Sequence, residues 1–105
     1  MDLSQLELHD ASLLAVALDP VARTVIVKLA YYPSGDSPER VAGTLQFSGV
    51  THFNQLSDLE LLEQHAKFGN VSQGIFGESA GTSYIYLARG LISVTASSVE
   101  FTNDA

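Results

Sequence analysis

The sequence contains no cysteine and no tryptophan, and only five lysine and arginine residues stand against twelve aspartate and glutamate residues. Without cysteine there is no disulfide framework, no thiolate zinc site, no iron–sulfur cluster and no cysteine nucleophile. A chain of 105 residues has the length of one small domain and can bury roughly two-thirds of its unfolded surface. We therefore expect a single domain over residues 1–105, held together by one core.

Long apolar runs are also absent. The longest, from Leu13 to Leu18, has six residues, whereas a span of the bilayer needs about 20. The first residues, Met1 to Ser4, have neither the basic start nor the apolar stretch of a secretory signal. We expect a soluble, cytoplasmic protein without a membrane partner.

Positive charge is scarce and scattered, and the formal net charge is -7. The cations stand one at a time, at Arg23, Lys28, Arg40, Lys67 and Arg89. Nucleic acids are bound by basic grooves that displace counterions, so the sequence predicts no nucleic-acid partner. An acidic surface favours solubility and encounter with a basic partner.

Alternating apolar residues predict two β-hairpins. In the first, Asp19 and Thr24 close a four-residue loop, which the Asp19 side chain stabilises by accepting backbone N–H groups. The predicted partners are Leu18 with Val25, Val16 with Val27, and Leu14 with Leu29. The other face carries Ala15, Ala17, Ile26 and Lys28, which favours cover by another element or by a second subunit.

The second predicted hairpin joins residues 84–88 and 91–95 through Arg89-Gly90, with Gly90 supplying a positive φ. This register places Leu87 opposite Ile92 and Ile85 opposite Val94 on the core face. On the other face, which is polar and aromatic, Tyr86 meets Ser93 and Tyr84 meets Thr95.

Further strands are predicted at 41–48 and 98–102, and one helix near 56–68. Ser57 and Glu60 have the spacing of a capping box, with Ser57 as N-cap, and Gly69-Asn70 supplies a stop. Leu59, Leu62 and Ala66 share one helical face, whose burial against the sheet must hold this short helix. The predicted class is α+β and mostly β: a curled antiparallel sheet of six or seven strands, as a sandwich or a partly open barrel.

Residues suited to catalysis or metal binding form no local motif. His9, His52 and His65 show none of the spacings that place two ligands on one face. Residues 77–81 match the letters G-x-S-x-G around Ser79, but no predicted buried strand and helix flank them. We therefore predict no catalytic residue, no metal and no cofactor.

Three features are candidates for binding. The first is the segment from Gly69 to Gly81, where Ile75 and Phe76 stand among four glycines. A short strand that anchors this loop to the core is the favoured explanation of the two apolar residues. The second is the pair Tyr84 and Tyr86, which offers area and hydroxyl groups at low entropic cost unless the helix covers it. The third is His9-Asp10, just before the first strand, where His9 also suits the orienting of a turn.

The segment from Leu8-His9-Asp10 through Leu18-Asp19, followed by Thr24 to Val27, resembles the start of small bacterial proteins, some of which are grouped with immunity proteins of polymorphic toxin systems. In these, an L-H-D-A/S-x-L entry leads into a β-hairpin. The resemblance implies a compact β-rich domain that acts by binding a protein, and it assigns no catalytic role to His9 or Asp10.

The function predicted from the sequence is a non-enzymatic protein-binding module, either immunity-like or self-associating as a homodimer. The alternative is a domain that binds a small molecule or a carbohydrate at the same tyrosine-bearing face. A metal-dependent enzyme is the third possibility.

Overall fold

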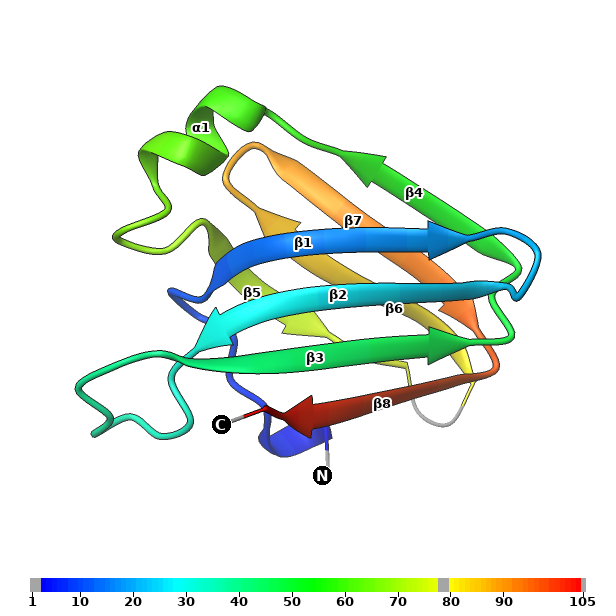
Figure 1. Cartoon of the computed structure of the whole chain (residues 1–105), viewed down its shortest axis with the longest axis horizontal. Helices are drawn as coiled ribbons and strands as arrows, with labels where there is room; N and C mark the ends of the chain where they lie inside the picture. Colours follow the sequence, from blue (N-terminus) through cyan, green and yellow to red (C-terminus); the bar gives the residue numbers. More distant parts are fainter. Residues whose placement is uncertain (1–2, 78–79, 105) are drawn as a thin grey trace.

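The computed structural model describes residues 3–77 and 80–104, which form eight strands in two antiparallel four-stranded sheets (Figure 1). The first sheet has the order β1 (Ser12–Asp19), β2 (Thr24–Tyr31), β3 (Val41–Ser48) and β8 (Ser98–Asn103). The second has the order β4 (His52–Leu56), β7 (Gly90–Ala96), β6 (Gly81–Leu87) and β5 (Val71–Ile75). A 3₁₀ turn, Leu3–Gln5, and one helix, α1 (Leu59–Gln64), complete the described elements.

This architecture confirms the predicted mostly-β class and selects the sandwich from the two predicted alternatives. The described residues form eight strands where six or seven were predicted: β4 was not predicted, and β5 was predicted only as the alternative to a binding loop. None of the helices in the described part of the chain is long and apolar enough to cross a membrane.

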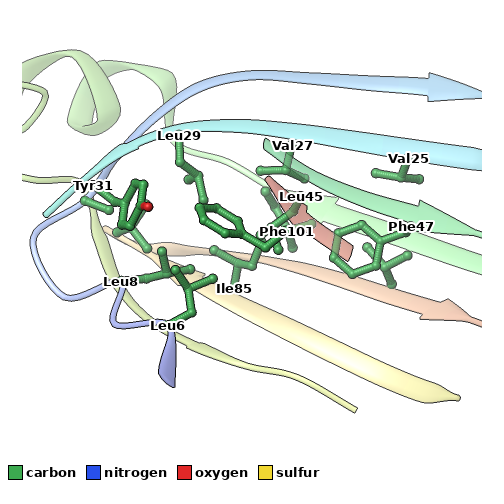
Figure 2. Close-up of a cluster of buried hydrophobic side chains, with 14 of the residues drawn as sticks. Leu6, Leu8, Val25, Val27, Leu29, Tyr31, Leu45, Phe47, Ile85 and Phe101 are labelled. Atoms are coloured by element: carbon green, nitrogen blue, oxygen red, sulfur yellow. The ribbon is translucent and has the colours of Figure 1, made fainter. Parts of the chain in front are cut away.

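The core lies between the two sheets, where buried side chains of six strands meet, and Figure 2 shows part of it. It is closed at one end by Leu6 and Leu8 from the segment that precedes β1. Period-two alternation is what buries one side of each strand. The members contributed by the strands include Val25, Val27, Leu29, Tyr31, Leu45, Phe47, Ile85, Ile92, Val94 and Phe101.

Within the core, the rings of Tyr31 and Phe101 pack edge to face, with centroids 5.0 Å apart and planes at 88°. They occupy the space above Gly43 of β3, where an added Cβ atom would lie 2.5 Å from the Phe101 ring. Glycine is therefore required at this buried strand position because two rings fill the place of its side chain.

The first hairpin confirms most of the predicted register. Leu18 faces Val25 and Val16 faces Val27, and the Asp19 carboxylate accepts two backbone N–H groups of the turn at 3.0 Å. The predicted partner of Leu29 was wrong. A β-bulge places Leu13 there and leaves Leu14 59% exposed, because the extra residue of a bulge has no partner on the opposite strand.

The second hairpin has the predicted faces but a register shifted by two residues. Leu87 lies opposite Gly90, so the turn is Ala88-Arg89, and Arg89 itself has the positive φ of 52°. Because the shift is two residues, every side chain keeps its predicted face. Gly90 has a different role: an added Cβ atom would collide with the backbone oxygen of Leu56 on β4.

Helix α1 is shorter than predicted and is held differently. Its N-cap is Asp58, whose carboxylate accepts the N–H of Leu61 at 3.1 Å, and not Ser57. No residue of α1 is buried: Leu59 is 74% exposed, and Leu62 is only partly buried against the core. The expectation that an apolar face would hold the helix to the sheet was wrong, since the helix lies beyond the ends of β1 and β4 (Figure 1).

Asn70, which is 4% exposed, attaches the end of the helical segment to the sandwich. Its side chain accepts the N–H of Leu13 at 2.8 Å and donates to the Leu62 carbonyl at 2.9 Å. Its backbone N–H donates to Ala11, and its carbonyl accepts from Ala88. One residue therefore connects β1, α1 and the β6–β7 turn.

The outer face of the first sheet is not covered by any described element. Ala15, Ala17 and Lys28 are exposed, and Ile26 is half-buried by its neighbours in the sheet. The described part of this chain therefore does not contain the covering element that was predicted for this face.

Candidate functional site

The outer face of the second sheet brings together three of the residues singled out from the sequence. Strand pairing places its side chains in rows that run across the strands. The middle row contains Ile75, Tyr84, Ser93 and Asn54. The flanking rows are Gln73, Tyr86, Leu91 and Leu56 on one side, and Thr82, Thr95 and His52 on the other. We call these eleven residues the tyrosine face.

The centre of the tyrosine face is a pair of aromatic rings. Tyr84 and Tyr86 stack with centroids 6.2 Å apart and an interplanar angle of 22°. Tyr84 is 36% exposed, and Ile75 beside it is 49% exposed. Tyrosine combines large contact area with few rotatable bonds, so the stacked pair forms an ordered aromatic surface that costs little entropy to bury.

The tyrosine face carries no aspartate, glutamate, lysine or arginine, although the chain as a whole has a formal charge of -7. The outer face of the first sheet differs, because exposed Lys28 and Glu100 lie on it. The central part of a protein–protein interface is likewise depleted of charged residues.

Ile75 and Phe76 point in different directions. Residues 71–75 form β5, so the glycine-containing segment is largely a strand at the edge of the sheet. Ile75 pairs with Tyr84 on the outer face. Phe76 is half-buried and packs against the core, and its ring fills the space above Gly74. Ile75 therefore belongs to the tyrosine face, whereas Phe76 anchors the end of β5.

His9 and Asp10 lie beside β5 and line a different surface. The His9 Nε2 atom is 3.5 Å from the Asp10 carboxylate, and both side chains are more than half exposed. The Asp10 backbone is fixed by a bond from its N–H to Val71 and one from Arg40 to its carbonyl. Together with Tyr32 and the loop that follows it, they line an open hollow of about 730 Å³. The structure thus separates this pair from the two tyrosines.

The histidines do not converge. His9 lies beside β5, His52 is on the tyrosine face and His65 caps the end of α1. Among residues 3–77 and 80–104, no group of three or more histidine and acidic side chains has an arrangement that could hold a metal ion. Ser79, the centre of the G-x-S-x-G letters, lies outside the described residues.

The sequence pattern placed the two tyrosines with Ser93 and Thr95 on one face and singled out Ile75, but it did not indicate Leu56, Leu91 and Asn54 as their neighbours. Leu91 was assigned to a strand without a role, and Leu56 to the start of a helix. The signal that identifies them is strand pairing, because residues on four strands form rows only when the order of the strands is known.

Comparison of the chain with protein-family models, with curated proteins and with solved structures finds no match. The resemblance, mainly of residues 8–30, to small bacterial β-rich proteins, some of them grouped with immunity proteins, therefore stays a prediction.

Proposed function

We propose that the chain is a non-enzymatic protein-binding module that associates with a second copy of itself through the tyrosine face. The observation that carries this proposal is a sheet face of exposed and half-buried side chains that has a stacked tyrosine pair and no Asp, Glu, Lys or Arg among its eleven residues, in a chain with a net charge of -7.

A second copy fits this face for an electrostatic reason. Two identical chains repel each other through their net charge, so self-association is favoured at the part of the surface where like charges do not meet. In a two-fold dimer each patch contacts its own copy. Stacked tyrosines, Ile75 and the hydroxyl and amide groups around them supply both apolar contacts and hydrogen bonds.

The size of the face sets the strength of the dimer. Four strands about 4.8 Å apart and three rows of side chains cover roughly 400 Å² per copy. Stable interfaces bury about 800 Å² per partner. The dimer should therefore be weak and should depend on protein concentration and on salt, which screens the repulsion between the acidic chains.

Sedimentation equilibrium over a range of concentrations tests the proposal. The wild-type average mass should rise from that of the 11.2 kDa monomer towards twice that value as concentration and salt increase. The double variant Tyr84→Ser/Tyr86→Ser should remain monomeric with an unchanged far-ultraviolet circular dichroism spectrum. Tyr32→Ser is the matched control, because Tyr32 lies on the other hollow, against Arg40.

A wild-type chain that is monomeric at every concentration would refute self-association, and so would a double variant that dimerises as the wild type does. Binding of a carbohydrate or another small molecule at the same face is the competing function. It would show as a change in tyrosine fluorescence on sugar titration without any change in mass.

A further inference from the structure

The open edge of β1 is a second surface with the properties of a binding site. Between Ser12 and Leu18 the strand has no charged residue and no proline, the usual devices that prevent an edge from pairing. Leu14 and Leu18 are 59% and 49% exposed. An open groove of about 430 Å³ runs beside this edge. One wall is formed by Leu13, Leu14 and Val16, and the other by Leu59 and Leu62 of α1 together with Ala66, which follows the helix.

Only part of the β1 edge is already occupied. At its start, Ala11 and Leu13 bond to Asn70 and Val71. Beyond the bulge at Leu14 the pairing with β2 continues to Asp19. The opposite side of the strand is unpaired in the described part of the chain, and the groove lies against its residues 13–16.

The backbone groups that face the groove follow from the alternation of an antiparallel ladder. The Arg23 carbonyl accepts a bond from Val50 on the β3 side, so the even-numbered residues of β2 bond to β1. Their partners include Ala17. Val16 and Leu18, on either side of Ala17, therefore direct their N–H and C=O groups away from β2 and towards an incoming strand.

The charge around the groove selects the partner. Of the described residues that line it, Glu63 alone is charged, and the charged residue of β1 is Asp19 at its far end. The chain has no lysine or arginine between residues 1 and 22 or between 41 and 66. A second copy would bring the same acidic residues together, whereas a segment with basic residues at its ends would complement them.

We propose that the groove between β1 and α1 binds an extended segment of a partner protein, apolar in its centre and flanked by lysine or arginine, which adds to the first sheet as a strand beside β1. The backbone of the segment pairs with Val16 and Leu18, and alternate apolar side chains enter the groove against Leu14, Leu59 and Leu62. This mode of recognition obtains affinity from main-chain hydrogen bonds and specificity from alternate side-chain positions.

The test uses a capped seven-residue peptide with three valines alternating with two threonines and a lysine at each end. Calorimetric titration of the wild type should show binding. The same peptide N-methylated at alternate residues, which keeps the charge but removes the pairing N–H groups, should not bind. Glu63 is exposed, so Glu63→Lys should fold. This variant should bind the lysine peptide about three- to tenfold more weakly and should gain affinity for a glutamate-flanked peptide.

Three results would overturn the proposal: no binding of the lysine peptide at millimolar concentration, equal binding of the N-methylated peptide, or affinities unchanged by Glu63→Lys. Dissociation of a wild-type dimer by the peptide would identify a second copy as the occupant and would also refute it. The titration is repeated with Tyr84→Ser/Tyr86→Ser. This variant changes only the tyrosine face. If it binds the peptide with the same affinity as the wild type, peptide binding at the groove does not depend on self-association.

Discussion

At the scale of single residues, buried polar groups decide how the parts of this molecule are attached. Asn70 is the main case, because its side chain and backbone bond to four other residues in three elements. The sequence indicated only that Gly69-Asn70 stops a helix. The side-chain bonds of Asn70 could not be predicted, since Leu13 is 57 residues away in the chain and the contact depends on the finished fold.

Replacing Asn70 with alanine should lower the free energy of unfolding by about 3 kcal/mol, because the Leu13 N–H and the Leu62 carbonyl would both lose their partner. Urea unfolding at low protein concentration measures this. Asn54→Ala is the matched control: Asn54 is exposed, so its loss should cost about 0.5 kcal/mol or less. An equal decrease in the free energy of unfolding for the two variants would show that the side-chain hydrogen bonds of Asn70 do not stabilise the attachment of the helical segment to the sandwich.

Tyr31 makes the free energy of unfolding depend on pH in the alkaline range. Burial raises the pKa of Tyr31 above its ordinary value near 10, the charge of Asp104 adds to this, and the Asn103 side chain acts in the opposite direction. Well below pH 10 the hydroxyl is protonated in both the folded and the unfolded state, so Tyr31 adds no pH dependence to the stability there. Above it the unfolded chain loses this proton first, and the free energy of unfolding therefore falls as pH rises.

Tyr31→Phe should remove this contribution. Measured by urea unfolding at a series of pH values from about 9 to 11, the stability of the variant should fall less steeply than that of the wild type. If both curves fell in parallel, the Tyr31 hydroxyl would not be responsible.

At the scale of elements, the sequence predicted which face of a sheet most side chains occupy. It predicted only in part which residues pair across neighbouring strands. Alternation in residues 14–18, 25–29, 84–88 and 91–95 assigned the side chains to the correct faces except for Leu14, which the β-bulge exposes. It could not fix the second hairpin, because registers two residues apart bury the same side chains. β4 was missed because its exposed edge sequence, His52–Leu56, lacks an apolar alternation.

The packing of β3 against its neighbours gives a prediction at this scale. Gly43→Ala should destabilise the fold by about 2 kcal/mol, because the Tyr31 and Phe101 rings must shift to admit a methyl group. Gly35→Ala is the control, since an added Cβ atom there meets nothing within 4 Å. Thermal or urea unfolding compares the two, and similar stabilities would contradict this role of Gly43.

At the scale of the whole molecule, charge is distributed unevenly over the sandwich. None of the twelve acidic residues is among the eleven residues of the tyrosine face. The one charged residue of β1 is Asp19, at the end of the strand. From composition we expected an acidic surface, without any indication of where the charges lie. The structure instead distinguishes an uncharged sheet face suited to a second copy from a groove with acidic residues around it suited to a basic segment.

Self-association through the tyrosine face is measured most directly by residue-resolved nuclear magnetic resonance during dilution. We expect concentration-dependent amide shifts at Ile75, Tyr84, Ser93 and Asn54, the row across the second sheet, and we expect these shifts to disappear in Tyr84→Ser/Tyr86→Ser. Constant shifts in that row would contradict self-association through this face, and so would shifts confined to the outer face of the first sheet.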